Sequence, residues 1–391
     1  MCKKIIVVTT SRADFGLLHP VIDLLIKDKK IELKVLITGS HLSKKYGYTV
    51  KEIDKKIIKK SIKINISINS DKPQAIAESL SIGTKSFSKI FIKFKPNLII
   101  LCGDRFELLS VASSALINKV PIAHIGGGDR TEGTIDESIR HAVTKLSHIH
   151  FVENKEFFKR VLQMGERRKN IFLVGPTVYE NINKLKLVPK KKLEKLLSFK
   201  FKKKNFLITF HPEILAKFKH QHLILGLLKT LKKFKEIGKI FTSPNNDMGS
   251  NIIRKQIISY IKKDHNSCFI DSFGHKNYLS CINYVDCVIG NSSSGIVEAP
   301  FFNKSTVNIG ERQQGRLRAS SVIDCKNNEK NITRSIKKAL SKKFINSIKQ
   351  IKNPYKINNA SKKILKIIKN INLNNLVKKR FYDLSFVLKK E

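Results

Sequence analysis

Short runs of β-branched and aliphatic residues alternate with longer amphipathic stretches, and this alternation constrains the fold more than any other feature of the chain. Strands that alternate with helical segments are typical of βαβ units and a parallel sheet. Helices are expected between the strands, for example at 17–27 and 106–118. In the first half, strands are expected at 5–9, 33–37, 64–68, 98–101, 122–124, 150–152 and 172–174.

The alternation pauses at Gly175-Pro176 and a Lys-rich stretch up to Lys204, and then resumes. The second series places strands at 206–210, 239–242, 268–270, 285–289 and 306–309. We therefore expect an α/β protein with two Rossmann-like, doubly wound domains and a ligand cleft between them. The expected boundaries are 1–176 for the first domain, 177–358 for the second, and 359–391 for a helical tail that crosses back to the first.

Composition places the chain in the soluble globular class, with 41% hydrophobic residues and apolar runs far shorter than the ~18 residues of a membrane span. The N-terminal apolar stretch is shorter than the core of a signal peptide, so we expect a cytoplasmic protein. The six cysteines include no Cys-x-x-Cys pair, and most lie in apolar runs. Neither disulfides nor a metal site is therefore expected.

The formal charge of +45 suggests nucleic-acid binding, but its composition argues against that function. Only 13 of the 76 basic residues are Arg, and the excess is Lys alongside abundant Ile and Asn, as an AT-rich genome supplies. Trp is absent. Seven arginines lie beside Gly, Ser, Asp or His in predicted loops: Arg12, Arg105, Arg130, Arg140, Arg312, Arg316 and Arg318.

Polar clusters follow nearly every predicted strand, which is where open α/β sheets bind their ligands. After the first strand, Arg12 stands at a helix start that favours an anion, although Ser11 and Asp14 also suit an ordinary N-cap. Asp104 follows a buried strand, where it is either an acid–base group or a cap for the next helix. Each of these two clusters therefore has both a functional and a structural interpretation.

Residues 124–133 are more unusual, because three consecutive glycines are flanked by acidic residues. Glycines remove side chains where something must approach the backbone closely. The helix that follows carries four ionisable residues, and its Asp136 and Arg140 have the i,i+4 spacing of a surface ion pair worth about 0.3 kcal/mol. The crowding of charges around a glycine loop favours a site over that structural alternative.

The second half repeats the pattern. His211 ends a strand, residues 244–250 form a polar turn, and residues 290–295 combine glycine with three serines before the helix that contains Glu298. Backbone N–H groups and hydroxyls in such a turn suit a diphosphate, with a Ser-rich N-cap as the alternative. A glycine-bounded loop at 310–316 adds two arginines. No Walker loop or Gly-x-Gly-x-x-Gly is present, which disfavours an ATPase or a dinucleotide enzyme.

Seven ordered segments carry a family resemblance: SRADFG, GDRFE, HIGGGDRTEGTIDESIRHAVTKLSH, FHPE, PNNDMGS, GNSSSGIVEAP and GERQQGR. Over residues 4–325 the chain resembles the hydrolysing UDP-N-acetylglucosamine 2-epimerases of sialic acid biosynthesis. The resemblance implies a glycosyltransferase-B fold. It also implies conversion of UDP-N-acetylglucosamine and water to N-acetylmannosamine and UDP, by elimination to a glycal and addition of water.

The resemblance further implies a nucleotide-sugar partner, a homo-oligomer (dimer or tetramer), and no cofactor, specific nucleic acid or membrane. A UDP- or GDP-linked 2,4-diacetamido-trideoxyhexose of the legionaminic acid pathway is the alternative substrate. The first turn differs from that of non-hydrolysing epimerases, and the carboxylate-rich loop argues against a glycosyltransferase. By motif, Arg12, Ser292, Ser293 and Arg312 hold the diphosphate, Glu298 the ribose and Asn245 the uracil side, while Asp104, Asp136, Arg140 and His211 line the reacting sugar.

The chain departs from this family at Gly126, where many relatives have an acidic residue or His. Glycine transfers no protons, so another group must do this work. Asp129 lies in the same glycine loop, and Glu132 lies three residues further on with a longer side chain. We therefore expect Asp129 to be essential for catalysis and Glu132 to be the next most sensitive position.

Overall fold

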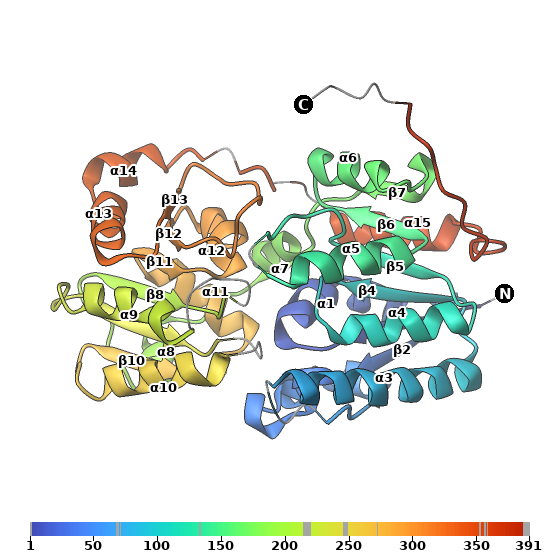
Figure 1. Cartoon of the computed structure of the whole chain (residues 1–391), viewed down its shortest axis with the longest axis horizontal. Helices are drawn as coiled ribbons and strands as arrows, with labels where there is room; N and C mark the ends of the chain where they lie inside the picture. Colours follow the sequence, from blue (N-terminus) through green and yellow to red (C-terminus); the bar gives the residue numbers. More distant parts are fainter. Residues whose placement is uncertain are drawn as a thin grey trace.

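The computed structural model describes residues 2–67, 70, 72–132, 134–213, 220–244, 249–271, 273–351, 353–355, 357 and 359–385. These residues form two α/β domains that lie side by side, each built around one parallel sheet (Figure 1). Among the helices of these ranges, none is both long enough and apolar enough to cross a bilayer.

The first sheet has seven parallel strands in the order β3-β2-β1-β4-β5-β6-β7. Because the strand order reverses between β1 and β4, the carboxyl ends of the strands border a crevice there. The strands are β1 (Lys3–Thr9), β2 (Ile31–Ile37), β3 (Ser61–Lys63), β4 (Leu98–Cys102), β5 (Ile122–Ile125), β6 (Ile149–Val152) and β7 (Ile171–Leu173).

Helices cover both faces of this sheet with separate apolar cores. One face packs against α3 (Pro73–Phe94), α4 (Glu107–Ile117) and α5 (Asp136–Leu146), and the other against α1 (Arg12–Lys27) and α15 (Ala360–Asn370). The remaining elements are α2 (Lys55–Ile58), α6 (Lys155–Gln163), and the 3-10 turns η1 (Gly39–Leu42), η2 (Lys44–Tyr46), η3 (Thr49–Glu52) and η4 (Arg168–Asn170).

The second sheet repeats the arrangement with six parallel strands in the order β10-β9-β8-β11-β12-β13. Its strands are β8 (Asn205–Thr209), β9 (Gly238–Thr242), β10 (Ser267–Ile270), β11 (Cys287–Gly290), β12 (Ser305–Ile309) and β13 (Val322–Cys325). Its helices are α8 (Lys190–Leu197), α9 (His220–Leu231), α10 (Ser250–Ile261), α11 (His275–Tyr284), α12 (Ser293–Val297), η5 (Ala299–Phe302), α13 (Glu329–Ala339) and α14 (Lys342–Ser347).

The two domains share an apolar core where the chain passes between them. Helix α7 (Val178–Lys184) lies between the two sheets in Figure 1, and its buried Tyr179 packs in a cluster that draws residues from both domains. The Tyr179 hydroxyl donates a 2.9 Å hydrogen bond to the carbonyl of Val297 in the second domain. The domains therefore meet through packed side chains as well as through the linking chain.

Two edge strands differ from the sequence prediction, whereas the other expected strands agree within two residues. The third strand lies at Ser61–Lys63 instead of 64–68, of which residue 68 lies outside the described residues. It is placed by pairing with Val35–Ile37 of β2, and a strand of only three residues has little periodicity of its own. The edge strand β13 was not expected, because Asp324 interrupts its short apolar run.

The chain returns to the first domain in α15, more than 180 residues after β7. Ile364 and Ile368 are fully buried there in the core that also contains α1. Lys3 Nζ donates hydrogen bonds of 2.8–2.9 Å to three carbonyls at the end of α15, among them that of Ile371. These contacts satisfy carbonyls that a helix C-terminus leaves without intrahelical partners. The segment beyond α15 continues along the first domain, where Tyr382 N donates to the Gly165 carbonyl at 2.9 Å.

Because α15 completes the core of the first domain, Ile364→Ala should lower the free energy of unfolding by about 2–5 kcal/mol, the usual cost of a buried Ile→Ala change. The measurement is urea denaturation followed by circular dichroism. Lys362→Ala, at an exposed position on the same helix, is the matched control and should change stability by less than about 0.5 kcal/mol. Equal stabilities for the two variants would show that α15 contributes no core packing.

Candidate active site

A cavity of about 270 Å³ lies at the carboxyl ends of both sheets. Its lining includes residues that lie within three positions after strands of each domain, as expected for ligand sites in doubly wound sheets. These are Ser11 and Arg12 after β1, Gly103 and Asp104 after β4, Gly126 after β5, Glu153 after β6, His211 after β8, Ser243 after β9, Ser292 after β11 and Arg312 after β12.

The start of α1 combines a helix cap with a cavity-facing cation. Ser11 and Asp14 form a reciprocal capping box, so the structural interpretation holds for these two residues. The buried Asp14 carboxylate also accepts hydrogen bonds from the hydroxyls of Thr9 and Thr10, at 2.5 and 2.6 Å. Arg12 lines the cavity, and burial lowers its pKa. The cap therefore positions a guanidinium at the mouth of the first sheet.

Arg140 organises the first-domain half of the site. Its guanidinium is 1% exposed and forms a hydrogen-bonded ion pair with Asp104, the residue expected as an acid–base group or helix cap. It also pairs with Glu137 at 3.0 Å and donates to the Asp129 carbonyl at 3.1 Å and to the Thr131 hydroxyl at 2.8 Å. Although burial opposes ionisation, the Arg140 and Arg316 charges lower the pKa of Asp104. The structural alternative of a surface Asp136–Arg140 pair does not apply, because Arg140 is buried and its guanidinium contacts Asp104 and Glu137.

Residues 126–128 are all glycine, but the physical reason for glycine differs between the three positions. A side chain at Gly127 would lie 2.8 Å from the Thr144 hydroxyl, and one at Gly128 would lie 2.5 Å from the Phe157 carbonyl. These two positions need glycine because the protein's own helices pack against the loop. Only Gly126 faces the cavity, where a β-carbon would meet nothing closer than Gly103 N at 3.9 Å. One glycine of the three thus leaves space for a ligand.

In the second domain, Asn291 joins the ends of two neighbouring strands. It is fully buried, its Oδ1 accepts from His211 N at 2.7 Å, and its Nδ2 donates to the His211 carbonyl at 2.9 Å. The side chain thereby fixes the backbone that carries His211 into the cavity. Ser292, Ser293 and Ser294 line the same cavity at the start of α12.

A loop of the second domain docks onto the glycine loop of the first. Arg316 Nη2 lies 2.9 Å from Asp129 Oδ2, and Arg312 Nη2 lies 3.6 Å from Asp136 Oδ2. Glu132 N donates to a carbonyl of this loop at 3.2 Å. The arginines that follow β12 thus face carboxylates that follow β5, and the ion pairs close one side of the cleft.

Most residues predicted from the sequence lie together around the cavity. The lining contains Arg12, Asp104, Asp129, Asp136, Arg140, His211, Ser292, Ser293, Glu298 and Arg312. Glu132 is not among the lining residues. Its side chain is 34% exposed and pairs with Arg130. Asn245 lies outside the described residues.

Several lining residues were not predicted, among them Glu153, His275 and Tyr278. The signal for Glu153 was present, because this residue directly follows a correctly predicted strand, as Asp104 does. No comparable local signal marks His275 or Tyr278. These residues lie on α11, and packing of that helix near α1 brings them to the cavity.

Two carboxylates of the cavity, one from each domain, lack strong partners. Burial raises the pKa of Glu153 to about 7, and the negative charge of Asp129 adds to the effect. Burial likewise raises the pKa of Glu298 to about 7. Among the described residues, neither carboxylate has a hydrogen-bonding side chain or a close ion pair. A cavity that holds both arginines and near-neutral carboxylates can bind an anion and transfer protons.

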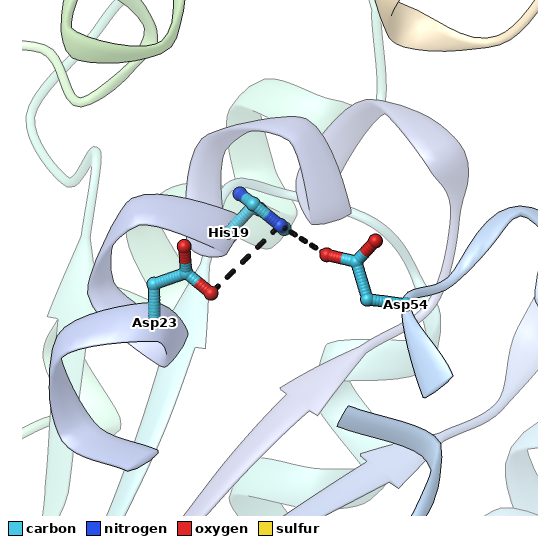
Figure 2. A group of neighbouring side chains, drawn as sticks. All are labelled: His19, Asp23 and Asp54. Carbon is cyan, nitrogen blue, oxygen red and sulfur yellow. Dashed lines mark hydrogen bonds and ion pairs between the residues drawn. The ribbon is translucent and has the colours of Figure 1, made fainter. Parts of the chain in front are cut away.

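A separate cluster on the surface of the first domain contains His19, Asp23 and Asp54, which are potential metal-ligand types (Figure 2). His19 Nε2 lies 2.8 Å from Asp54 Oδ2 and 4.0 Å from Asp23 Oδ1. Lys56 Nζ lies 2.9 Å from Asp23 Oδ1 and supplies positive charge within the cluster. These contacts form an ion-pair network that ties α1 to the segment around α2.

Comparisons with known proteins agree with the geometry. A family profile described as UDP-N-acetylglucosamine 2-epimerase matches residues 24–369. A Campylobacter jejuni protein named GDP/UDP-N,N'-diacetylbacillosamine 2-epimerase (hydrolyzing) is 39% identical, over 98% of this chain and 99% of its own. Polysialic acid biosynthesis protein P7 of Escherichia coli is 36% identical over 98% of each chain. The crystal structure of Neisseria meningitidis UDP-GlcNAc 2-epimerase bound to UDP-GlcNAc superposes with a TM-score of 0.79 at 22% identity, covering 94% of this chain and 100% of that one.

Removal of the buried guanidinium should destabilise the first domain. Arg140→Leu leaves the Asp104 and Glu137 carboxylates without their counter-ion, so we expect the free energy of unfolding to fall by about 3–5 kcal/mol. Urea denaturation measures the change. Lys159→Ala breaks an exposed pair with Glu156 and should cost less than about 1 kcal/mol. If Arg140→Leu is no less stable than this control, the buried network does not hold the site together.

Proposed function

The chain belongs to the UDP-N-acetylglucosamine 2-epimerase family, and we propose from this that it hydrolyses a nucleoside-diphosphate 2-acetamido sugar with inversion at C2. The observation that carries the proposal is the composition of one cavity. Five arginines line it together with six carboxylates, and both domains contribute to each group. Guanidinium groups bind diphosphates through charge-assisted hydrogen bonds, and carboxylates of raised pKa transfer protons near neutral pH.

In this proposal the reaction has two halves. A base of the site takes the C2 proton, the C–H electron pair forms a C1=C2 double bond, and the C1–O bond breaks with its pair leaving on the nucleoside diphosphate. Water then adds to C1 of the glycal while a proton returns to C2 on the opposite face. Asp104, Asp136, Arg140 and His211 surround the sugar, and cations stabilise the leaving group.

The nucleotide half of the substrate binds where the second domain meets α1. Arg12, Ser292, Ser293 and Arg312 hold the diphosphate, and Glu298 accepts hydrogen bonds from the ribose. Both arginines line the cavity, and Ser292 and Ser293 stand at the start of α12. Backbone N–H groups at this turn add to the attraction for the diphosphate.

Within this class we propose a 2,4-diacetamido-2,4,6-trideoxyhexose as the sugar, with UDP-N-acetylglucosamine as the second candidate. A relative 39% identical over nearly the whole chain is named for N,N'-diacetylbacillosamine. The open space in front of Gly126 and Gly103 also gives room for an acetamido group in place of a hydroxyl. The 36% identical relative named for polysialic acid synthesis supports the second candidate.

The purified protein should be incubated in deuterium oxide with UDP- and GDP-N,N'-diacetylbacillosamine and with UDP-N-acetylglucosamine. We expect NMR to show a free, C2-inverted sugar carrying deuterium at C2, formed fastest from a diacetamido substrate. Fastest turnover of UDP-N-acetylglucosamine would favour the second candidate. Release of an unepimerised sugar, or an epimer still attached to nucleotide, would contradict the reaction itself.

Arg312→Ala tests the diphosphate site, because a truncated arginine loses a charge-assisted pair. We expect UDP binding, measured by calorimetry, to weaken by about 2–3 kcal/mol, roughly 30- to 150-fold. Arg334→Ala, at an exposed position on α13, is the matched control and should bind UDP normally. Unchanged affinity in Arg312→Ala would remove this residue from the nucleotide site.

A further inference from the structure

The cavity lining has no side chain at the position that follows β5, and this position is called the glycine gap below. Inversion at C2 requires one group to take a proton and another to return one on the opposite face, so the proposed reaction needs proton-transferring side chains on both sides of the sugar. The position that follows β5 is Gly126, which supplies none. Its backbone faces the cavity, and a β-carbon there would meet only Gly103 N, at 3.9 Å.

The neighbouring strand supplies a carboxylate at the same level. Strand β6 pairs in parallel with β5, Ile125 lies opposite Phe151, and Gly126 N donates to the Phe151 carbonyl at 3.0 Å. Glu153 follows β6 directly and lines the same cavity as Gly126. Adjacent strands lie about 4.8 Å apart, a span that a glutamate side chain can bridge.

Asp104 and Glu153 therefore flank the glycine gap. Asp104 follows β4 and Glu153 follows β6, with β5 between them in the sheet. The two backbones are separated by two strand spacings, on the order of 10 Å, which leaves room for one pyranose ring between their carboxylates. This placement matches the need for groups on opposite faces of the sugar.

Asp129 and Asp104, the first-domain carboxylates that follow β5 and β4, have partners. Asp129 Oδ2 pairs with Arg316 at 2.9 Å, and its Oδ1 accepts the backbone N–H of Arg130 at 2.8 Å. Asp104 is held by Arg140. In the described part of the chain, the Glu153 carboxylate has no such hydrogen bond or ion pair. It can therefore exchange a proton with a bound ligand without first breaking such a contact.

Charged groups from four segments face Glu153. They are Asp129 of the glycine loop, Arg140 of α5, Arg316 of the loop after β12, and Glu298 after α12. Burial and the two acidic neighbours outweigh the two arginines and raise the pKa of Glu153 to about 7. A group with this pKa carries a proton in a substantial fraction of molecules at neutral pH and can donate it.

We propose, on the basis of the function proposed above, that Glu153 is the catalytic acid that replaces the side chain absent at Gly126. The acid form of Glu153 gives its proton to C2 of the glycal, and the C1=C2 electron pair forms the new C–H bond. Water adds to C1, and the proton it loses passes to the Glu153 carboxylate, which restores the acid form. The C2 proton taken in the first half leaves from its own base to solvent.

Glu153→Gln is the direct test, after wild-type turnover with deuterium at C2 has been established. We expect formation of the inverted sugar to fall by about 10²- to 10⁴-fold, with UDP affinity and thermal stability close to wild type. Because elimination does not use Glu153, nucleotide release should fall less and the glycal should accumulate, which NMR detects. Glu153→Asp should recover part of the activity. Glu156→Gln, at a half-exposed position on α6, is the matched control.

The pH profile gives a second readout. Because the acid form is required, the wild-type rate of inverted-sugar formation should fall as pH rises through about 7, and the residual activity of Glu153→Gln should lack this limb. Near-normal turnover of Glu153→Gln, or loss of nucleotide release without glycal, would overturn the proposal. So would glycal accumulation in Asp129→Asn in place of Glu153→Gln, since the role would then pass to Asp129. If the wild-type enzyme releases no inverted sugar from any candidate, the proposed function and this inference fall together.

Discussion

One buried guanidinium holds the first-domain half of the cleft in place. Arg140 is almost fully inaccessible, yet it contacts Asp104 after β4, Glu137 one turn earlier on its own helix, and the glycine loop through Asp129 and Thr131. A charge in a low-dielectric interior requires such a complete set of partners. Because these partners come from separate segments, their relative positions depend on this single side chain, and the cavity's shape depends on them.

The same principle joins the two domains. Arg312 and Arg316 follow one strand of the second sheet and face Asp136 and Asp129 of the first. Under the proposed function, a diphosphate bound near these arginines changes the charges that face the carboxylates of the first domain. Nucleotide binding and the protonation of the sugar site are therefore expected to be linked, and the near-neutral pKa of Glu298 places a further titratable group at this junction. In contrast, the large excess of lysine contributes little to the cavity, whose lining contains arginine and no lysine among the described residues.

The sequence predicted site residues correctly where they follow the carboxyl ends of strands. It missed residues that long-range packing brings to the cavity. Polar residues after strand ends were expected to meet, and Asp104, His211 and Arg312 do so. The same rule applies to Glu153, which follows β6 and was not among the predicted site residues. The i,i+4 spacing of Asp136 and Arg140 also suited a surface ion pair, an alternative that the crowding of charges around the glycine loop disfavoured. In the structure the buried Arg140 guanidinium pairs with the partly buried Asp104, and burial of the guanidinium strengthens this contact beyond an exposed pair on one helix.

By itself the sequence determined the α/β class, the two series of strands and the strand ends that carry polar groups. These properties depend on short-range periodicity and on the carboxyl-end rule for parallel sheets. Only the tertiary structure decided the edge strands β3 and β13, the face of the first sheet on which α15 packs, and which charges pair across the cleft. The register of a three-residue edge strand is set by its pairing with the neighbouring strand. The position of α15 is set by packing against the apolar face of α1. Which carboxylate stays unpaired beside Gly126 likewise depends on contacts between segments far apart in the chain, which local periodicity does not encode.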